Sequence, residues 1–178
     1  LFEPYRADFF RGDSFQVYVK DAKDALKLAL TCRTLAIHLP TVEDEPLSDI
    51  RISVGIGEVI SPITALATAK GEAFLLSGRS FDNMVKAGKR LQLSMTDPLA
   101  NLTLELMSDY LNSIYAGITT KQAEVILELL KGRTQQEIAE KLSRSKSTVN
   151  QHVSSGRWEE IERLMWQYER LLIISAEK

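Results

Sequence analysis

Cysteine, histidine and long apolar runs are all scarce in this sequence, and each scarcity excludes a class of protein. The single cysteine, Cys32, excludes an internal disulfide and fits a reducing compartment. The two histidines, His38 and His152, lie too far apart in the chain for a compact zinc pattern. No apolar run reaches transmembrane length and no charged-then-apolar leader opens the chain, so we expect a cytoplasmic protein with no membrane partner.

The remaining composition is that of an ordinary globular protein. Its 178 residues are 44% hydrophobic and 26% charged, with a net charge of −2 and no disorder signature. This length allows one large domain or two small ones. The chain begins with Leu1 inside an aromatic strand pattern rather than with Met, so we expect a further segment before it.

Residues 117–157 hold two short apolar-periodic segments around a three-residue polar break, the pattern of a helix-turn-helix. Thr134 and Glu137 have capping-box spacing, so the first helix should begin at Thr134 and end near Leu142. The turn is residues 143–145. Its first position is Ser143 instead of the common Gly, so Ser143 must adopt a left-handed conformation or the turn must change shape. The residues expected between the two helices are Ile138, Ala139, Leu142 and Val149.

The second helix should present a polar face to solvent and an apolar face to the core. The polar face carries Ser145, Lys146, Ser147, Asn150, Gln151 and Ser154, and the apolar face carries Val149 and Val153. Because Asn and Gln side chains can pair with adenine edges, we expect Asn150 and Gln151 to read bases. Arg144 and Lys146 flank the start of this helix and are expected to hold phosphates.

These segments resemble the LuxR-type DNA-binding domain and, more distantly, region four of sigma factors. Three family patterns have counterparts here. The pattern L-T-x-R-E-x-E-V corresponds to Ile118, Thr119, Lys121, Gln122, Glu124 and Val125, and G-x-[ST]-x-x-E-I-A corresponds to Gly132, Thr134, Glu137, Ile138 and Ala139. The pattern T-V-x-x-H corresponds to Thr148, Val149 and His152. The match departs at Lys121 and Gln122, where the family usually has Arg and Glu. The resemblance implies double-stranded DNA as the partner; a plain helical bundle with a polar turn is the alternative interpretation.

Basic charge is concentrated in the same stretch. Residues 131–157 contain six basic residues and two acidic ones, a net charge of +4 in a chain of net −2. The basic residues are Lys131, Arg133, Lys141, Arg144, Lys146 and Arg157, and the acidic ones are Glu137 and Glu140. A local basic face on an otherwise acidic protein is typical of a module that binds DNA.

The first half of the chain alternates strand and helix patterns. Residues 5–19 alternate apolar and polar around Gly12-Asp13, which predicts a hairpin. Helices are predicted over residues 21–39 and 71–87, and strands over 50–59 and 91–95. This order describes an α/β, ferredoxin-like sandwich that lacks its usual first strand.

Two long helices are predicted on either side of the helix-turn-helix. The first, over residues 99–115, follows Asp97-Pro98, and its expected buried stripe is Leu102, Leu106, Tyr110 and Ile114. The last helix has a wide apolar face. We expect this face to join two copies in a homodimer through Trp158, Ile161, Met165, Tyr168 and Leu172. The alternatives are that the face packs on the 99–115 helix, or that the α/β domain forms the dimer.

Three segments of the first half resemble the catalytic fold of class III nucleotide cyclases, and the whole arrangement resembles the SatD family. They are Gly12-Asp13 with residues 15–17, residues 51–59, and residues 71–79 against the cyclase pattern G-x-x-V-N-x-x-A-R. The resemblance implies Mg²⁺ or a nucleotide at Asp13 and a vestigial phosphate site at Arg79. However, Leu75 replaces the catalytic Asn and cannot donate a hydrogen bond, so we predict no cyclase activity. Asp13 as a turn residue and Arg79 as a surface residue are the alternative interpretations.

The sequence therefore predicts a degenerate cyclase-like α/β domain over residues 1–96, a linker helix over 97–116 and an all-α helix-turn-helix domain over 117–178. The expected function is that of a DNA-binding transcriptional regulator, not an enzyme, whose first domain dimerises or senses a small molecule or nucleotide. Two alternatives stay open. One is a nucleotide-processing enzyme with an accessory helix-turn-helix, and the other is an interaction module whose C-terminal helices bind protein.

Overall fold

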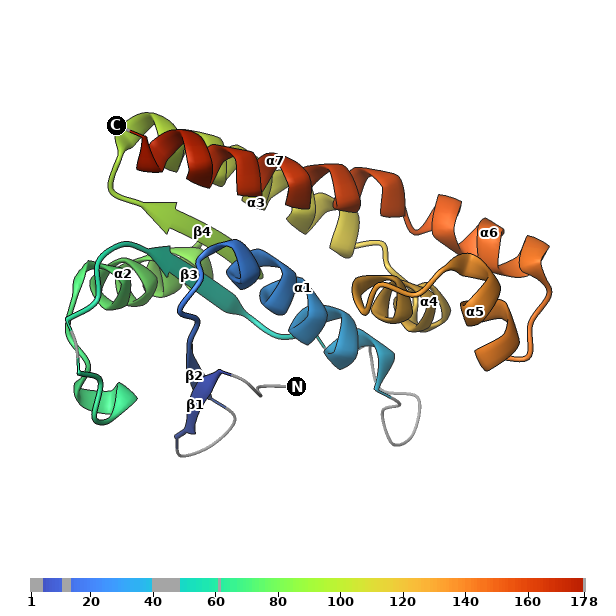
Figure 1. The fold of residues 1–178 in the computed structure, drawn as a ribbon, viewed down its shortest axis with the longest axis horizontal. Helices are drawn as coiled ribbons and strands as arrows, with labels where there is room; N and C mark the ends of the chain where they lie inside the picture. The colour runs from blue at the N-terminus through green and yellow to red at the C-terminus, as the bar shows by residue number, and fades with distance from the viewer. Residues whose placement is uncertain (1–4, 11–13, 40–48, 61, 178) are drawn as a thin grey trace.

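The computed structural model describes residues 5–10, 14–39, 49–60 and 62–177. Its elements are β1 (Arg6–Phe9), β2 (Phe15–Tyr18), α1 (Lys23–His38), β3 (Ile52–Ile56), the short 3₁₀ helix η1 (Leu66–Thr68), α2 (Glu72–Lys86), β4 (Leu91–Met95), α3 (Pro98–Tyr115), α4 (Thr120–Leu130), α5 (Gln135–Lys141), α6 (Lys146–Ser155) and α7 (Trp158–Ala176). This order confirms the mixed α/β first half and the all-helical second half that the sequence predicts (Figure 1). Within these residues no helix is long and apolar enough to cross a membrane.

The described strands form two separate two-stranded sheets and not the single sheet of a ferredoxin-like sandwich. In one sheet β1 pairs antiparallel with β2, with Phe9 opposite Phe15. In the other, β3 pairs parallel with β4 through the crossover helix α2. Gly55 lets α2 lie close on β3, because a Cβ there would stand 2.1 Å from the Ala73 carbonyl oxygen. The predicted turn at Gly12-Asp13 lies outside the described residues.

Helix α3 buries a different apolar stripe from the one that its sequence pattern favoured. Leu102, Leu106 and Tyr110 are 53%, 65% and 38% exposed, so only Ile114 of the expected stripe is buried. The buried face consists of Ala100, Leu104, Met107, Ser108, Leu111, Ile114 and Tyr115. The prediction was wrong because α3 carries two apolar stripes, and contacts with β4 and α7 selected the second one.

Helix α7 lies alongside α3 and buries its apolar face within its own chain (Figure 1). Trp158, Ile161, Tyr168 and Leu172 are each under 9% exposed, and Met165 packs at the edge of the same core. The Tyr168 hydroxyl donates a hydrogen bond of 2.7 Å to the carbonyl oxygen of Ala22, just before α1. The prediction that this face joins two copies was therefore wrong, and packing within the chain is what the structure shows.

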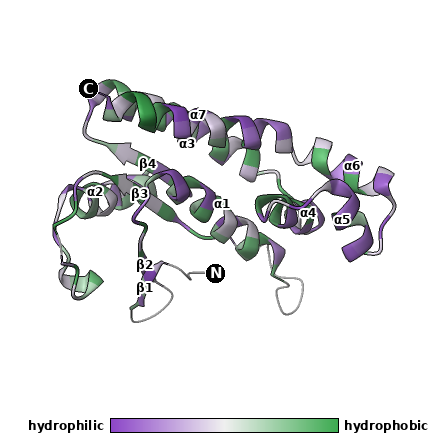
Figure 2. Ribbon diagram, in the orientation of Figure 1, coloured by the Kyte–Doolittle hydropathy of each residue, from purple (hydrophilic) through white to green (hydrophobic). Residues whose placement is uncertain are grey.

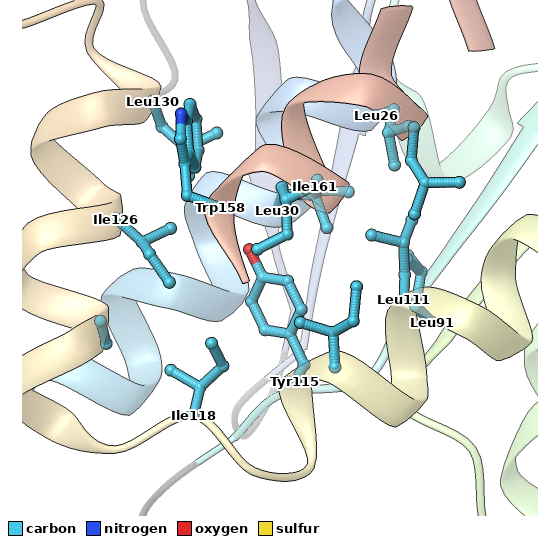
Figure 3. Packing of buried hydrophobic residues seen from close by; sticks show 14 of the residues in the cluster. Leu26, Leu30, Leu91, Leu111, Tyr115, Ile118, Ile126, Leu130, Trp158 and Ile161 are labelled. Atoms are coloured by element: carbon cyan, nitrogen blue, oxygen red, sulfur yellow. The ribbon is translucent and has the colours of Figure 1, made fainter. Parts of the chain in front are cut away.

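One hydrophobic core connects the α/β part to the helical part. Figure 3 shows side chains of α1, α3, α4 and α7 converging in this core, including Leu30, Tyr115, Ile126 and Ile161. Buried Arg33 on α1 adds hydrogen bonds between segments. Its guanidinium donates to both carboxylate oxygens of Asp49 and, at 3.2 Å, to the side-chain oxygen of Asn112 on α3. The helix-turn-helix is consequently held by the rest of the chain, and the domain boundaries at 96 and 116 stay a prediction.

Candidate nucleic-acid interface

Local hydrogen bonds set the starts of the first two helices of the interface. Thr119 and Gln122 form a capping box on α4, so Gln122 serves where the LuxR pattern usually has Glu. The Gln122 side chain also donates to the Ser155 hydroxyl at 3.0 Å, which joins α4 to the end of α6. Thr134 and Glu137 form the predicted capping box on α5, and the Thr134 amide donates to Glu137 at 2.7 Å. Hydrogen bonds from the backbone and then the side chain of Thr134 lower the pKa of Glu137.

The turn between α5 and α6 keeps its shape without glycine. Ser143 adopts the left-handed conformation, with φ of 51°, which was the first of the two options that the sequence left open. The Arg144 amide then donates to the Ala139 carbonyl oxygen at 2.9 Å and closes the end of α5. Ser145 caps α6 by accepting from the Thr148 amide at 3.1 Å.

Helix α6 has the two faces that its sequence predicts. Val149 and Val153 are 0% and 5% exposed and pack inward, and α5 contributes Ile138 and Ala139 to the same contact. The opposite face is exposed and carries Ser145, Lys146, Ser147, Asn150, Gln151 and Ser154. Figure 2 shows hydrophilic colour over α5 and parts of α6, at the end of the molecule away from the sheets. The geometry therefore presents donors and acceptors along a helix face that can enter a major groove.

A close backbone approach holds the end of α6 against α4. A Cβ at Gly156 would stand 2.7 Å from the His152 carbonyl oxygen and 3.1 Å from Cδ1 of Ile126. Arg157 follows in the left-handed conformation, with φ of 56°. Its guanidinium donates to Glu160 at 2.8 Å and to the Tyr110 hydroxyl at 2.9 Å. Hydrogen bonds from Arg157 and Tyr110 lower the pKa of Glu160 to about 2 and tie the α6–α7 junction to α3.

Much of the basic charge counted along the sequence is neutralised by carboxylates. Glu128 on α4 is 5% exposed and accepts ion pairs from Lys131 at 2.9 Å, Arg133 at 2.9 Å and Lys141 at 2.7 Å. Burial alone raises the pKa of Glu128, but hydrogen bonds from Lys141 and Lys131 outweigh burial and leave that pKa lowered.

Two further ion pairs complete this neutralisation. Arg144, one of the two expected phosphate-binding residues, pairs with Glu124 of α4 at 2.5 Å, and Arg157 pairs with Glu160. When the stretch is widened from residues 131–157 to residues 124–160, so that it includes these acidic partners, it contains six basic and six acidic residues. The net charge of the wider stretch is therefore zero instead of +4. Among the described residues, Lys146 is the basic side chain of this group that stands exposed without an ion pair.

Sequence reasoning did not identify Glu124 and Glu128 as carboxylates that pair with the basic residues of this region, or Tyr110 as a partner of Arg157. The signal for Glu128 was present, because an acidic residue between Leu127 and Leu129 on an apolar helix needs a charged partner when buried. Its partners lie on α5 and on the segment before it, and only the packing of these segments on α4 identifies them.

The second expected site, at Asp13 and Arg79, is not tested by the described residues. Asp13 lies outside them. Arg79 is exposed on α2, and Leu75, at the catalytic Asn position of the cyclase pattern, is 60% exposed. No group of three or more His, Cys, Asp or Glu side chains suited to a metal ion occurs in the described part of the chain.

Comparison with known proteins agrees with this geometry. Residues 116–156 match the model of the family described as bacterial regulatory proteins, luxR family. No curated protein and no solved structure matches the chain. Residues 116–156 are therefore a LuxR-family helix-turn-helix domain, and that family binds DNA.

Proposed function

We propose that this protein is a transcriptional regulator that inserts α6 into the major groove of its DNA site. The observation that most directly supports this proposal is the polar, exposed face of α6 within a segment that matches the luxR family of regulatory proteins. In this proposal Asn150 and Gln151 contact base edges, and Lys146 contacts a phosphate beside the N-terminus of α6. Arg144 would reach a phosphate only by giving up its ion pair with Glu124.

Two substitutions on α6 separate base reading from phosphate binding. Asn150→Ala should cost about 1–3 kcal/mol on the specific site and relax sequence preference. Lys146→Ala should weaken specific and random duplexes alike and reduce the slope of log affinity against log salt by about 1. The assay is fluorescence anisotropy over a salt series, on a site selected from random duplexes. Lys86→Ala, which removes an exposed cation from α2, is the matched control and should change neither quantity.

Two results would overturn the proposal. One is binding to duplex DNA that Lys146→Ala and Lys86→Ala weaken equally. The other is no salt-dependent binding to any duplex, which would favour the alternative that these helices bind protein.

For residues 1–96 we propose a role in sensing a small molecule or nucleotide, without catalysis, because the pairing surface proposed below lies on α3 and α7. The support is the core that α1 shares with α4 and α7, since a change in α1 would reach the DNA-binding helices through it. The cyclase-like, SatD-like assignment stays a prediction from resemblance. Cyclic nucleotide formed from ATP or GTP with Mg²⁺ or Mn²⁺ would contradict the non-enzymatic role and favour the nucleotide-processing alternative.

We also propose that the protein binds DNA as a homodimer, since one helix-turn-helix reads too few bases to select a single genomic site. The surface proposed for pairing is the α3/α7 groove, an apolar hollow with a volume of about 520 Å³ whose lining includes Leu106, Tyr110, Trp166 and Ile174. Exposed apolar side chains continue along both helices: Leu99, Leu102, Leu106, Tyr110, Trp166, Ile173 and Ile174. Because each of these side chains is about half exposed, together they offer roughly 600 Å² of accessible surface. This area approaches the ~800 Å² that each partner buries in a stable interface.

Substitution of the α3/α7 groove tests this dimer. Leu106→Glu with Ile174→Glu should give a monomer in sedimentation at micromolar protein, because each charge would be buried without a partner in the pair. Ile60→Glu changes a side chain of similar exposure, 64%, on the α/β part and should leave the dimer intact. A wild-type protein that is monomeric at that concentration, or a dimer that both variants retain, would contradict the proposal.

A further inference from the structure

Polar side-chain contacts join both ends of α6 to α4. At the C-terminal end, the Gln122 side chain donates to the Ser155 hydroxyl at 3.0 Å. At the N-terminal end, Nη2 of Arg144, in the turn directly before α6, donates to Oε2 of Glu124 at 2.5 Å. Gln122 and Glu124 are two positions apart, about 200° around the axis of α4. The N-terminal and C-terminal contacts therefore start from opposite sides of α4.

The guanidinium of Arg144 is turned toward the protein and not toward solvent. The side chain is 25% exposed, and its Nη1 atom is buried without a hydrogen-bond partner among the described residues. A donor buried without a partner costs free energy, so other contacts must hold this side chain in place, and the ion pair with Glu124 is the one that the structure shows. The backbone of the same residue is also held, because its amide donates to the Ala139 carbonyl oxygen at 2.9 Å.

The N-terminal contact limits how far α6 can rotate on α4. Apolar packing alone allows crossing angles to scatter by about 15–20°. Without this contact, α6 could pivot about Ser155, and Asn150 lies five residues before it, about 7.5 Å along the helix. A rotation of about 15° would move Asn150 by about 2 Å, which exceeds the narrow distance range of a hydrogen bond. Base reading by Asn150 therefore depends on the pair of Arg144 with Glu124.

We propose that Arg144 and Glu124 form a positioning pair, which orients α6 for base reading while Arg144 itself makes no contact with DNA. The inference rests on the proposed function, since it concerns how α6 is aimed at its site. It differs from the phosphate-binding role that the sequence suggests for Arg144. Lys146, which is exposed, keeps its proposed phosphate contact.

Arg144→Met tests the positioning role in the anisotropy assay described above. Methionine fills apolar space and carries no charge, so the substitution removes the ion pair and keeps much of the packing. Affinity for the selected site should fall at least about 10-fold, because base contacts are lost, and affinity for random duplexes should change less than about 2-fold. The slope of log affinity against log salt should not change. Loss of a phosphate contact, as in Lys146→Ala, should instead reduce that slope by about 1.

Glu124→Ala distinguishes the two roles of Arg144 by the sign of its effect. If Glu124 only held Arg144 back from a phosphate, removal of the carboxylate would tighten binding. As half of a positioning pair, its removal should weaken binding to the selected site at least about 5-fold. Glu140→Ala removes the same charge from an exposed position on α5 and should not weaken binding, so it is the control. A protein with both Arg144→Met and Glu124→Ala should bind no more weakly than either single variant, because both remove the same contact.

The outcomes separate this inference from DNA binding itself. Equal loss on selected and random duplexes with a reduced salt slope in Arg144→Met would overturn the positioning role, and so would tighter binding in Glu124→Ala. Either result would leave DNA binding by α6 in place. A wild-type protein without salt-dependent binding to any duplex would overturn the proposed function and this inference together. Binding to random duplexes that persists in the variants shows that they are folded, so a loss confined to the selected site supports the positioning pair.

Discussion

Replacing Glu128 by Gln tests whether the buried carboxylate of α4 stabilises the helix-turn-helix. In the wild type this carboxylate, 5% exposed, pairs with Lys131, Arg133 and Lys141 at 2.7–2.9 Å. Glutamine keeps the shape of the side chain and can accept a hydrogen bond, but it has no charge. The substitution therefore removes three ion pairs and leaves the packing around residue 128 in place.

The expected loss is smaller than for a fully buried ion pair. Breaking such a pair costs about 3–5 kcal/mol, because one charge is left buried and unpaired. Here the three cations left behind are 41–46% exposed and can hydrate, so we expect a loss of about 1–2 kcal/mol in the free energy of unfolding at pH 7. In a protein of this size the melting temperature should fall by about 3–6 °C.

The pH dependence of that loss follows from the lowered pKa of Glu128. A carboxyl whose pKa is lower in the folded state than in the unfolded state stabilises the protein above the unfolded value, about 4.5. That contribution is lost as the pH falls through the folded pKa. The difference in stability between wild type and Glu128→Gln should therefore be full at pH 7 and shrink below about pH 4.

The assay is chemical denaturation of both proteins at pH 7 and at pH 3.5. Glu140→Gln is the matched control, since it removes the same charge from an exposed position on α5 and should cost less than about 0.5 kcal/mol. Equal losses in the two variants, or a loss in Glu128→Gln that does not change with pH, would refute the reasoning.

Two further predictions concern backbone positions in the helix-turn-helix. Ser143→Gly should raise the free energy of unfolding by about 1 kcal/mol, because Ser143 has a φ of 51° and glycine adopts that conformation without strain; a loss in thermal denaturation would contradict this. Gly156→Ala should lower the free energy of unfolding by about 1–3 kcal/mol, because the new Cβ would stand 2.7 Å from the His152 carbonyl oxygen and 3.1 Å from Cδ1 of Ile126. Ser154→Ala, on the exposed face of α6, is its control, and equal stability of the two alanine variants would argue against the close contact.

Features that depend on a few neighbouring residues were predictable from the sequence. The capping box of Thr134 with Glu137 joins residues three apart, and it starts α5 as predicted. The alternation that places Val149 and Val153 inward and Asn150 outward follows from helix periodicity alone. The luxR match from 116 to 156 covers the same local stretch. When two residues interact within one or two helical turns, both lie in one short stretch of sequence, so these features could be predicted without tertiary information.

Features that depend on which segments meet were decided only by the tertiary structure. Helix α3 has two apolar stripes, and packing on β4 and α7 buried Leu104 and left Leu106 exposed. The charge of the DNA-binding stretch depends likewise on Glu124 and Glu128, which belong to a different helix from the cations they neutralise. Periodicity identifies a face and composition identifies a charge, but burial and pairing are properties of two surfaces in contact, and one segment of sequence describes only one of them.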